Sequence, residues 1–188
     1  MPRISPAAAG GRNVCAFLDT IAHAEIGPEM LAMSDDGYDV LVGSLPGDLH
    51  LFAEYADHPL PNDGDAIEYA PGVWSTAAGR YQILNTYWPH YKRQLGLSDF
   101  GPVSQDRYAI QQIREQRALP LIQSGRFSRA VEACSNIWAS LPGAGYGQRE
   151  HEVETLVRVY VKAGGRLAGR DRNWYDRVVK TPVGKGAT

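Results

Sequence analysis

One amphipathic helix pattern followed by a long stretch rich in Gly, Pro and Asp is the feature that most limits how this chain can fold. From about Val14 to Glu25, apolar residues recur three or four positions apart, as on one face of a helix. From Gly27 to Ser75, turn formers such as DDG, LPGD and PNDGD separate the short segments YDVLVG, LHLFAEYA and AIEYA. These segments carry the β-branched and aromatic residues that favour strands. The pattern predicts a small, irregular antiparallel sheet after the first helix.

Helical periodicity dominates from Arg80 onward. Apolar residues three or four apart, with Gly or Pro near the ends, predict helices over residues 80–96, 104–125, 126–141 and 149–165. Pro89 lies inside the first of these and is expected to bend or break it. The order of elements therefore predicts an α+β fold, in which a small, irregular β-sheet lobe and a larger helical lobe are separated by a cleft.

The two ends of the chain differ in composition from the middle. Residues 1–13 are rich in Pro, Ala and Gly and are expected to form a flexible arm. Residues 14–165 are expected to form one folded domain, and 166–188 a basic tail that is partly helical around residues 174–179. The two cysteines, Cys15 and Cys134, have no partner at metal-ligand spacing, so we expect two buried free thiols.

Charge is divided unevenly along the chain. The net charge is −2, yet residues 13–79 hold twelve acidic residues and no Lys or Arg, whereas residues 80–188 hold 17 basic against 9 acidic residues. Either two solvated surfaces simply differ, or an acidic region surrounds a working carboxylate while a basic region meets an anionic polymer. The sequence leaves both interpretations open.

Glu25, in the segment HAEIG, occupies an unusual place for an acid. It follows Phe17 and Ile21 at intervals of four and so continues the stripe that the helix turns toward its core. Burial beside apolar groups raises the pKa of a carboxyl, as do surrounding acids, so Glu25 is a candidate general acid. The alternative is a partly exposed helix-end residue.

Two further segments contain the groups that a sugar-binding site needs. STAAGRYQIL, residues 75–84, combines small residues with Arg, Tyr and Gln, and CSNIWASLPGAGYGQ, residues 134–148, combines amide and aromatic groups with a Gly-rich loop. Amides match sugar hydroxyls, and aromatic rings stack on sugar faces. The structural alternative is that Trp138 belongs to the core and the Gly-rich segment is only a turn.

Taken in order, AFLDTIAHAEIG, GYDVLVG, YADHP, STAAGRYQIL, YWPHYKRQLGLSDFGPVSQD, AIQQI and CSNIWASLPGAGYGQ resemble the endolysins of the phage lambda lysozyme type. The resemblance runs from about Ala16 to Gly165. It implies a lysozyme-like fold and the activity of a peptidoglycan lytic transglycosylase, with residues 14–165 as the catalytic domain. Residues 44–73 are less alike, so the resemblance says least about the sugar contacts there.

The resemblance assigns the catalytic role to Glu25, although Ile26 before Gly27 departs slightly from the family pattern. It implies that Gln82, Tyr81 and Tyr146 hold the sugar and that Trp138 supports the loop from behind. The full set of expected substrate-binding residues is Tyr38, Asp39, His58, Ser75, Gly79, Arg80, Tyr81, Gln82, Tyr146 and Gln148.

The implied reaction cleaves the β-1,4 bond between N-acetylmuramic acid and N-acetylglucosamine with one carboxyl group and leaves a 1,6-anhydro ring. Two alternatives stay open. A muramidase would hydrolyse the same bond with water and a second carboxylate, Asp39 or Asp57, although Asp in such segments more often fixes turns. A protein of another class would bind the cell wall without cleaving it.

Partners and location follow from the same resemblance. We expect peptidoglycan glycan strands as the substrate, a monomer, and no nucleic acid, membrane, cofactor or metal partner; the five histidines lack the HxxH and HExxH spacings of metal sites. The N-terminal residues lack the apolar region of an export signal. We therefore expect the protein to stay in the host cytoplasm until a holin-type membrane protein releases it to the periplasm.

Overall fold

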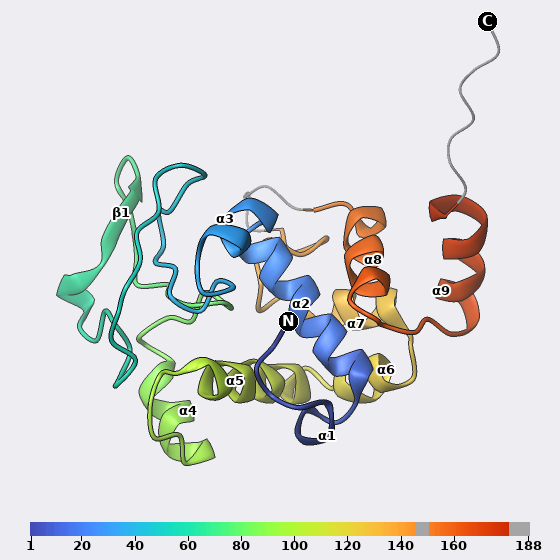
Figure 1. Cartoon of the computed structure of the whole chain (residues 1–188), viewed down its shortest axis with the longest axis horizontal. Coiled ribbons are helices and arrows are strands. Elements are labelled where there is room, and N and C mark those ends of the chain that lie inside the picture. The colour runs from blue at the N-terminus through green and yellow to red at the C-terminus, as the bar shows by residue number, and fades with distance from the viewer. Residues whose placement is uncertain (146–150, 181–188) are drawn as a thin grey trace, which may run out of the picture.

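The computed structural model describes residues 1–145 and 151–180, which form a body of helices with a small β lobe at one end (Figure 1). The α+β arrangement predicted from the sequence is confirmed. Among the described residues, no helix has the length and apolar character that crossing a membrane requires. The elements in chain order are α1 (Pro6–Ala9), α2 (Arg12–Glu25), α3 (Pro28–Met33), the 3-10 turn η1 (Asp63–Asp65), β1 (Ile67–Ala70), β2 (Val73–Ser75), α4 (Trp88–Leu95), α5 (Pro102–Glu115), α6 (Leu119–Gln123), α7 (Phe127–Cys134), α8 (Val153–Lys162), α9 (Gly169–Trp174) and the π-helical turn η2 (Tyr175–Val179).

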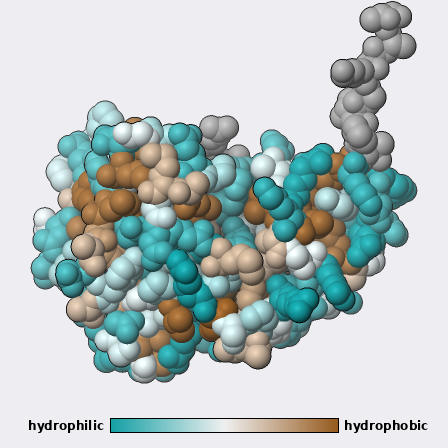
Figure 2. Space-filling view, viewed as in Figure 1, coloured by the Kyte–Doolittle hydropathy of each residue, from teal (hydrophilic) through white to brown (hydrophobic). Residues whose placement is uncertain are grey.

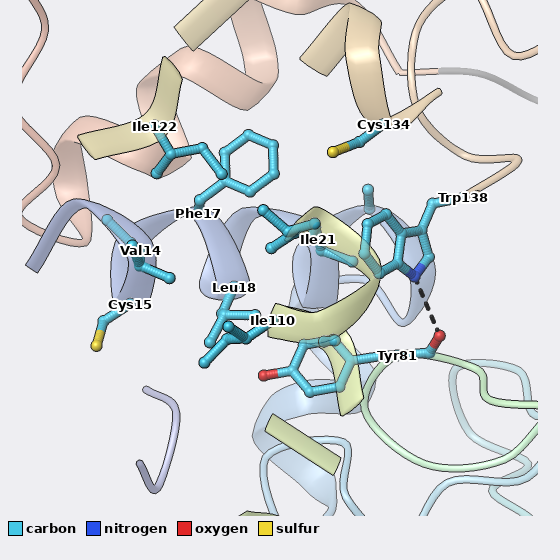
Figure 3. Close-up of a cluster of buried hydrophobic side chains, with 14 of the residues drawn as sticks. Val14, Cys15, Phe17, Leu18, Ile21, Tyr81, Ile110, Ile122, Cys134 and Trp138 are labelled. Carbon is cyan, nitrogen blue, oxygen red and sulfur yellow. Dashed lines mark hydrogen bonds between the residues drawn. The ribbon is translucent and has the colours of Figure 1, made fainter. Parts of the chain in front are cut away.

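Helix α2 is the centre of the core. It packs against α5, α6 and α8, and its apolar stripe, which includes Phe17 and Ile21, is buried. Figure 3 shows Phe17 directed toward Ile122 of α6, while the two cysteines lie on different sides of the cluster. Both are buried and free, as the sequence predicted. The periodicity that marked this helix in the sequence therefore reports its packing correctly.

The β lobe is less regular than predicted. Only AIEYA forms one of the expected strands: β1 pairs with β2 in an antiparallel hairpin, in the register Ile67 to Ser75 and Glu68 to Trp74. YDVLVG and LHLFAEYA meet through an isolated bridge, Val40 to Leu51. Successive amides of the first segment bond to different parts of the chain, Leu41 to His50 and Val42 to Ala77, so no continuous ladder forms.

The helix predicted over residues 80–96 is shorter than expected. It begins at Trp88, and Pro89 lies in its first turn, where the missing N–H needs no helical partner. Pro89 therefore starts the helix and does not bend it. The preceding residues follow an irregular path that includes a positive φ of 47° at Gln82.

The remaining helices are also divided more finely than predicted. The pattern over residues 104–125 gives two helices, α5 and α6, separated near Arg117, whose φ is 56°. The third pattern ends as a helix at Cys134, before Asn136 and Trp138. Local backbone conformation at these points overrides the continuing apolar periodicity.

The prediction of a flexible arm over residues 1–13 is wrong. Ser5 caps the short helix α1, and Ile4 and Ala9 are buried in the core. The Ile4 amide donates to the Asp106 carboxylate at 2.8 Å, and the Arg3 amide donates to the Tyr38 hydroxyl at 3.1 Å. Contacts with residues far along the chain order this segment, and local composition did not reveal them.

The C-terminal segment is folded as far as residue 180. The expected helical turn around residues 174–179 is present, split between α9 and η2. Leu167, Asp171 and Val179 are buried, and η2 packs against α8. This part of the predicted tail is therefore built into the helical body.

Candidate active site

Glu25 is the last residue of α2, at a turn through Ile26 and Gly27. Its side chain is half-buried, and the Ser140 hydroxyl donates a hydrogen bond to its Oε1 atom. Burial raises the pKa of the Glu25 carboxyl, and the hydrogen bonds from Ser140 only partly oppose this rise. A carboxyl in this state keeps its proton to a higher pH than an ordinary Glu. It can therefore donate that proton as a general acid.

The loop after α7 holds the partner of this acid in place. The amide of His151 donates to the Ser140 carbonyl at 3.0 Å, and the rings of His151 and His23 lie 5.8 Å apart between centroids. Burial, together with His151 and Lys162, lowers the pKa of His23, which favours its neutral form. The backbone bond from His151 thus positions the hydroxyl that contacts Glu25.

A cavity of about 520 Å³ adjoins the same loop. Ala139, the residue before Ser140, and Gln82 both line it. Its wall is rich in aromatic rings and amides, the groups that suit sugar faces and hydroxyls. The lining residues are Tyr81, Gln82, Ile83, Leu84, Tyr87, Tyr91, Tyr108, Gln112, Glu115, Gln116, Asn136, Ile137, Trp138 and Ala139.

In the segment from Gly79 to Gln82, the first residues pack in the core and Gln82 lines this cavity. A side chain at Gly79 would collide with Gln105, and its φ of 74° also favours glycine. The Arg80 side chain is buried and forms ion pairs with Asp19 at 2.6 Å and Asp36 at 2.9 Å. Gln82 is half-buried, lines the cavity, and donates to the Gly79 carbonyl at 3.0 Å.

Two tyrosines expected to contact the sugar are core residues. Tyr38 and Tyr81 are buried, and both hydroxyls donate to the same oxygen of Asp106, at 2.7 and 2.6 Å. Figure 3 shows Tyr81 within the apolar cluster, and its carbonyl accepts a hydrogen bond from the Trp138 indole. The side chains of Tyr38, Tyr81 and Arg80 are therefore enclosed and bonded within the protein, although Tyr81 also lines the cavity. That they bind substrate stays a prediction. They position the segments beside Glu25 and Gln82.

His58 is also a structural residue. It is buried, and its ring nitrogens lie 2.9 Å from the Ile83 carbonyl and 3.1 Å from the Leu60 carbonyl. Burial lowers its pKa and favours the neutral ring. Both ring nitrogens are thus occupied by the fold, and the binding of substrate by His58 stays a prediction.

The two rival carboxylates have local partners. Asp57 accepts hydrogen bonds from the Trp88 indole at 2.6 Å and the His58 amide at 2.9 Å, and it pairs with Lys92 at 2.8 Å. Burial alone would raise the pKa of Asp57, but these donors hold it below the usual range. Asp39 is half-buried and accepts from the Asp35 amide at 2.9 Å. The backbone amides bound by Asp57 and by Asp39 are the contacts expected of aspartates that fix turns.

The remaining predicted ligands are placed less decisively. Ser75 ends β2, is half-buried, and accepts from the Ala77 amide at 3.1 Å. Tyr146 and Gln148 lie outside the described residues. Among the predicted substrate ligands that the structure describes, Gln82 is the one that lines the cavity through an accessible polar side chain.

Comparison with known proteins places this geometry in a family. The Endolysin family profile matches residues 15–167. The endolysin of Escherichia phage P2 is 52% identical over 155 residues, covering 82% of this chain and 94% of the relative, and that of Escherichia phage lambda is 47% identical over 154 residues, covering 81% and 91%. The chain belongs to the endolysin family.

The solved structures agree with this assignment. Bacteriophage lambda lysozyme complexed with a chitohexasaccharide superposes with a TM-score of 0.74 at 43% identity, covering 89% of this chain and all of that one. A second structure of lambda lysozyme gives a TM-score of 0.71 at 42% identity, with the same coverage. The lysozyme-like fold predicted from the sequence is confirmed. This endolysin is thus a homologue of lambda lysozyme that acts in cell-wall lysis.

Several site residues of this endolysin were missed in the sequence. Ser140, which contacts Glu25, lies inside the quoted CSNIWASLPGAGYGQ segment but carries no pattern of its own. Tyr108, Gln112 and Gln116 follow one another at intervals of four, so they share one face of α5 and its end. This polar and aromatic stripe was a readable signal for the cavity wall.

Proposed function

We propose that this endolysin cleaves the β-1,4 bond between N-acetylmuramic acid and N-acetylglucosamine by lytic transglycosylation, with Glu25 as its one catalytic carboxyl group. The observation that carries the proposal is the state of Glu25: half-buried, with a raised pKa, and bonded to a hydroxyl. Asp39 and Asp57, the carboxylates that a hydrolase would need, serve local structure. The relation to a lysozyme solved with a chitohexasaccharide supports a glycan substrate.

In the proposed reaction Glu25 acts twice. As the acid, it protonates the glycosidic oxygen, and the bond from that oxygen to C1 of the muramoyl sugar breaks. As the carboxylate, it then takes the proton of the C6 hydroxyl of the same sugar, whose oxygen bonds to C1. The 1,6-anhydro ring closes without consuming water and Glu25 regains its proton. An intramolecular nucleophile is favoured because its effective concentration exceeds that of an external one.

The cavity that Gln82 and Ala139 line supplies the binding groups in this proposal. Gln82 offers amide hydrogen bonds, and Tyr87 and Tyr91 offer ring faces, within the volume of about 520 Å³. We include Tyr146 and Gln148 as further ligands on the strength of the sequence resemblance. Because the wall lies beyond the inner membrane, the proposal also requires release from the host cytoplasm to the periplasm, by a holin-type protein.

Digestion of purified peptidoglycan in oxygen-18 water tests the reaction. Transglycosylation leaves 1,6-anhydromuramoyl ends that are lighter by one water than hydrolytic products and carry no label. Mass spectrometry of the released fragments distinguishes the two outcomes. Label at new reducing ends would overturn the proposal in favour of a muramidase.

Two substitutions identify the acid. Glu25→Gln keeps the shape of the side chain but removes its titrating proton, so turnover should fall by about three orders of magnitude or more, with the fold retained. Asp39→Asn is the matched control, and we expect it to leave both the rate, within a few-fold, and the product type unchanged. Loss of turbidity of permeabilised Gram-negative cells reports the rates. If neither variant differs from the native enzyme, Glu25 is not the acid; if the native protein itself clears no cells, it is a wall-binding protein.

A further inference from the structure

A second cavity lies at the opposite end of the helical body from the β lobe. It has a volume of about 710 Å³ and is formed where α9 lies beside the α6–α7 turn (Figure 1). Arg126, Arg129, Arg170 and Trp174 are among its lining residues. None of these residues lines the first cavity, the one that Gln82 lines. We call this cavity the C-terminal groove.

The groove has an excess of positive charge. Its three arginines are exposed, and none forms an ion pair within residues 1–145 and 151–180. Asp171, the acidic residue of the lining, is buried and already occupied: it accepts the hydroxyl of Ser128 at 2.6 Å and the amide of Ser128 at 3.2 Å. The guanidinium groups therefore remain available to an anion from outside.

The groove is also built on a fixed framework. The Ala168 amide donates to the Gly125 carbonyl at 3.0 Å, and a side chain at Gly125 would come within 2.5 Å of the Arg166 carbonyl oxygen. Trp174 is half-buried and packs on the hydrophobic core. These contacts fix the backbone on both sides of the groove, so the ordering cost on binding falls mainly on the arginine side chains.

Helix α9 begins after the last residue that the family profile matches. The family profile ends at residue 167, and the two lambda lysozyme structures are covered completely by 89% of this chain. Figure 2 shows hydrophilic and hydrophobic surface side by side at the α9 end of the molecule. The α9 wall of the groove therefore lies outside the residues that the family profile matches, whereas Arg126 and Arg129 lie within them.

We propose that the C-terminal groove binds the carboxylate-bearing peptides of peptidoglycan, as a second contact on the polymer that Glu25 cleaves; this rests on the proposed function for its substrate. Arginine forms paired hydrogen bonds with carboxylates, and the Trp174 wall accommodates the apolar parts of a peptide. Two contacts on one polymer raise the local concentration of enzyme without altering the chemistry at Glu25.

Binding to purified sacculi tests this site, with Glu25→Gln present in every protein so that no cleavage occurs. The groove variant carries R126Q, R129Q and R170Q. The control carries R93Q, R158Q and R172Q, which remove three exposed arginines that do not line the groove. All six side chains are exposed, so both proteins should unfold at the same temperature as the parent.

Sedimentation at low salt should show that the groove variant binds sacculi roughly tenfold more weakly, against less than twofold for the control. The difference should disappear at high salt and on sacculi whose carboxylates have been converted to methyl amides. Equal weakening in both variants, or no weakening in either, would overturn the proposal. The proposal would also be overturned if the groove variant still bound amidated sacculi more weakly than the parent. Weaker binding seen only on phosphatidylglycerol vesicles, measured in the same way, would indicate a lipid site instead. Because cleavage is absent, the result stands whether the reaction is transglycosylation or hydrolysis.

Discussion

At the scale of single residues, the burial of Glu25 links activity to stability. Burial raises the pKa of the Glu25 carboxyl above its ordinary value of 4.5. Between pH 4.5 and the pKa of the folded state, the folded protein therefore binds a proton that the unfolded chain has lost. The stability that this carboxyl contributes is fully present below pH 4.5 and is lost as pH rises through the folded-state pKa. The same titration removes the proton needed for catalysis, so turnover should fall over the same range.

Glu25→Gln should therefore change thermal stability in a pH-dependent way. The amide is neutral at every pH, so the variant should unfold at a higher temperature than the native protein at pH 8, and at nearly the same temperature at pH 4. Scanning calorimetry at the two pH values measures the difference. An identical shift at both would mean that the Glu25 carboxyl is not perturbed by the fold.

Arg80 was expected to bind substrate, but its side chain forms ion pairs within the protein. Its side chain is 2% exposed and is paired with Asp19 and Asp36. Arg80→Gln should therefore lose about 1.5–3 kcal/mol of unfolding free energy, because these half-buried carboxylates lose charge-assisted hydrogen bonds. Urea denaturation measures the loss. Arg93→Gln, at an exposed position, is the control and should stay within about 0.5 kcal/mol. Reduced turnover with unchanged stability would restore the role of substrate ligand.

Glu25 could be found from the sequence because an acid interrupting an apolar stripe is visible within one helix. The roles of Tyr38 and Tyr81 could not, because both depend on Asp106, which lies 68 and 25 positions away. A tyrosine that binds a buried carboxylate and one that stacks on a sugar look the same in a single sequence. Only the fold brings the three groups together.

At the scale of elements, long periodic helices were predictable and their ends were not. The apolar stripe of α2 extends over the whole helix, so its existence was clear. A proline such as Pro89 can either break a helix or occupy its first turn, and the sequence alone does not decide between these positions. The same ambiguity affected the short β segments, because their hydrogen-bond partners are distant.

Two substitutions in residues 1–9, the segment that ends with α1, test whether this segment is packed on the core. Ile4 is buried, so Ile4→Ala should lower the unfolding free energy by about 2–3 kcal/mol, by loss of apolar contact and creation of a cavity. Ala8→Ser, at an exposed position of the same segment, should change it by less than about 0.5 kcal/mol. Chemical denaturation compares the two. Equal, small effects would mean that the segment is detached in solution, as its composition first suggested.

At the scale of the whole molecule, the division of charge corresponds to a division of position. The acidic stretch, residues 13–79, includes α2 except for its first residue, Arg12, with Glu25 at the end of the helix, and both strands of the β lobe. The basic remainder forms most of the helical body and the C-terminal groove. Linear charge counting identified the two regions but not the groove, because Arg126 and Arg170 become neighbours only when α9 folds against the start of α7.

Removing the C-terminal segment therefore tests whether it is an appendage or part of the body. Truncation after Gly165 deletes Leu167 and Val179, which are buried, and the Asp171 carboxylate that binds Ser128 at the start of α7. Loss of the two apolar side chains alone should cost roughly 3–6 kcal/mol of unfolding free energy. Turnover should then fall on sacculi and on small soluble glycans alike at the temperature where the native enzyme is fully folded.

The groove variant R126Q, R129Q and R170Q, with Glu25 intact, should instead keep its unfolding temperature and its turnover on soluble glycans. A truncated protein with an unchanged unfolding temperature would show that residues 166–180 are an independent tail, held against the body without stabilising it.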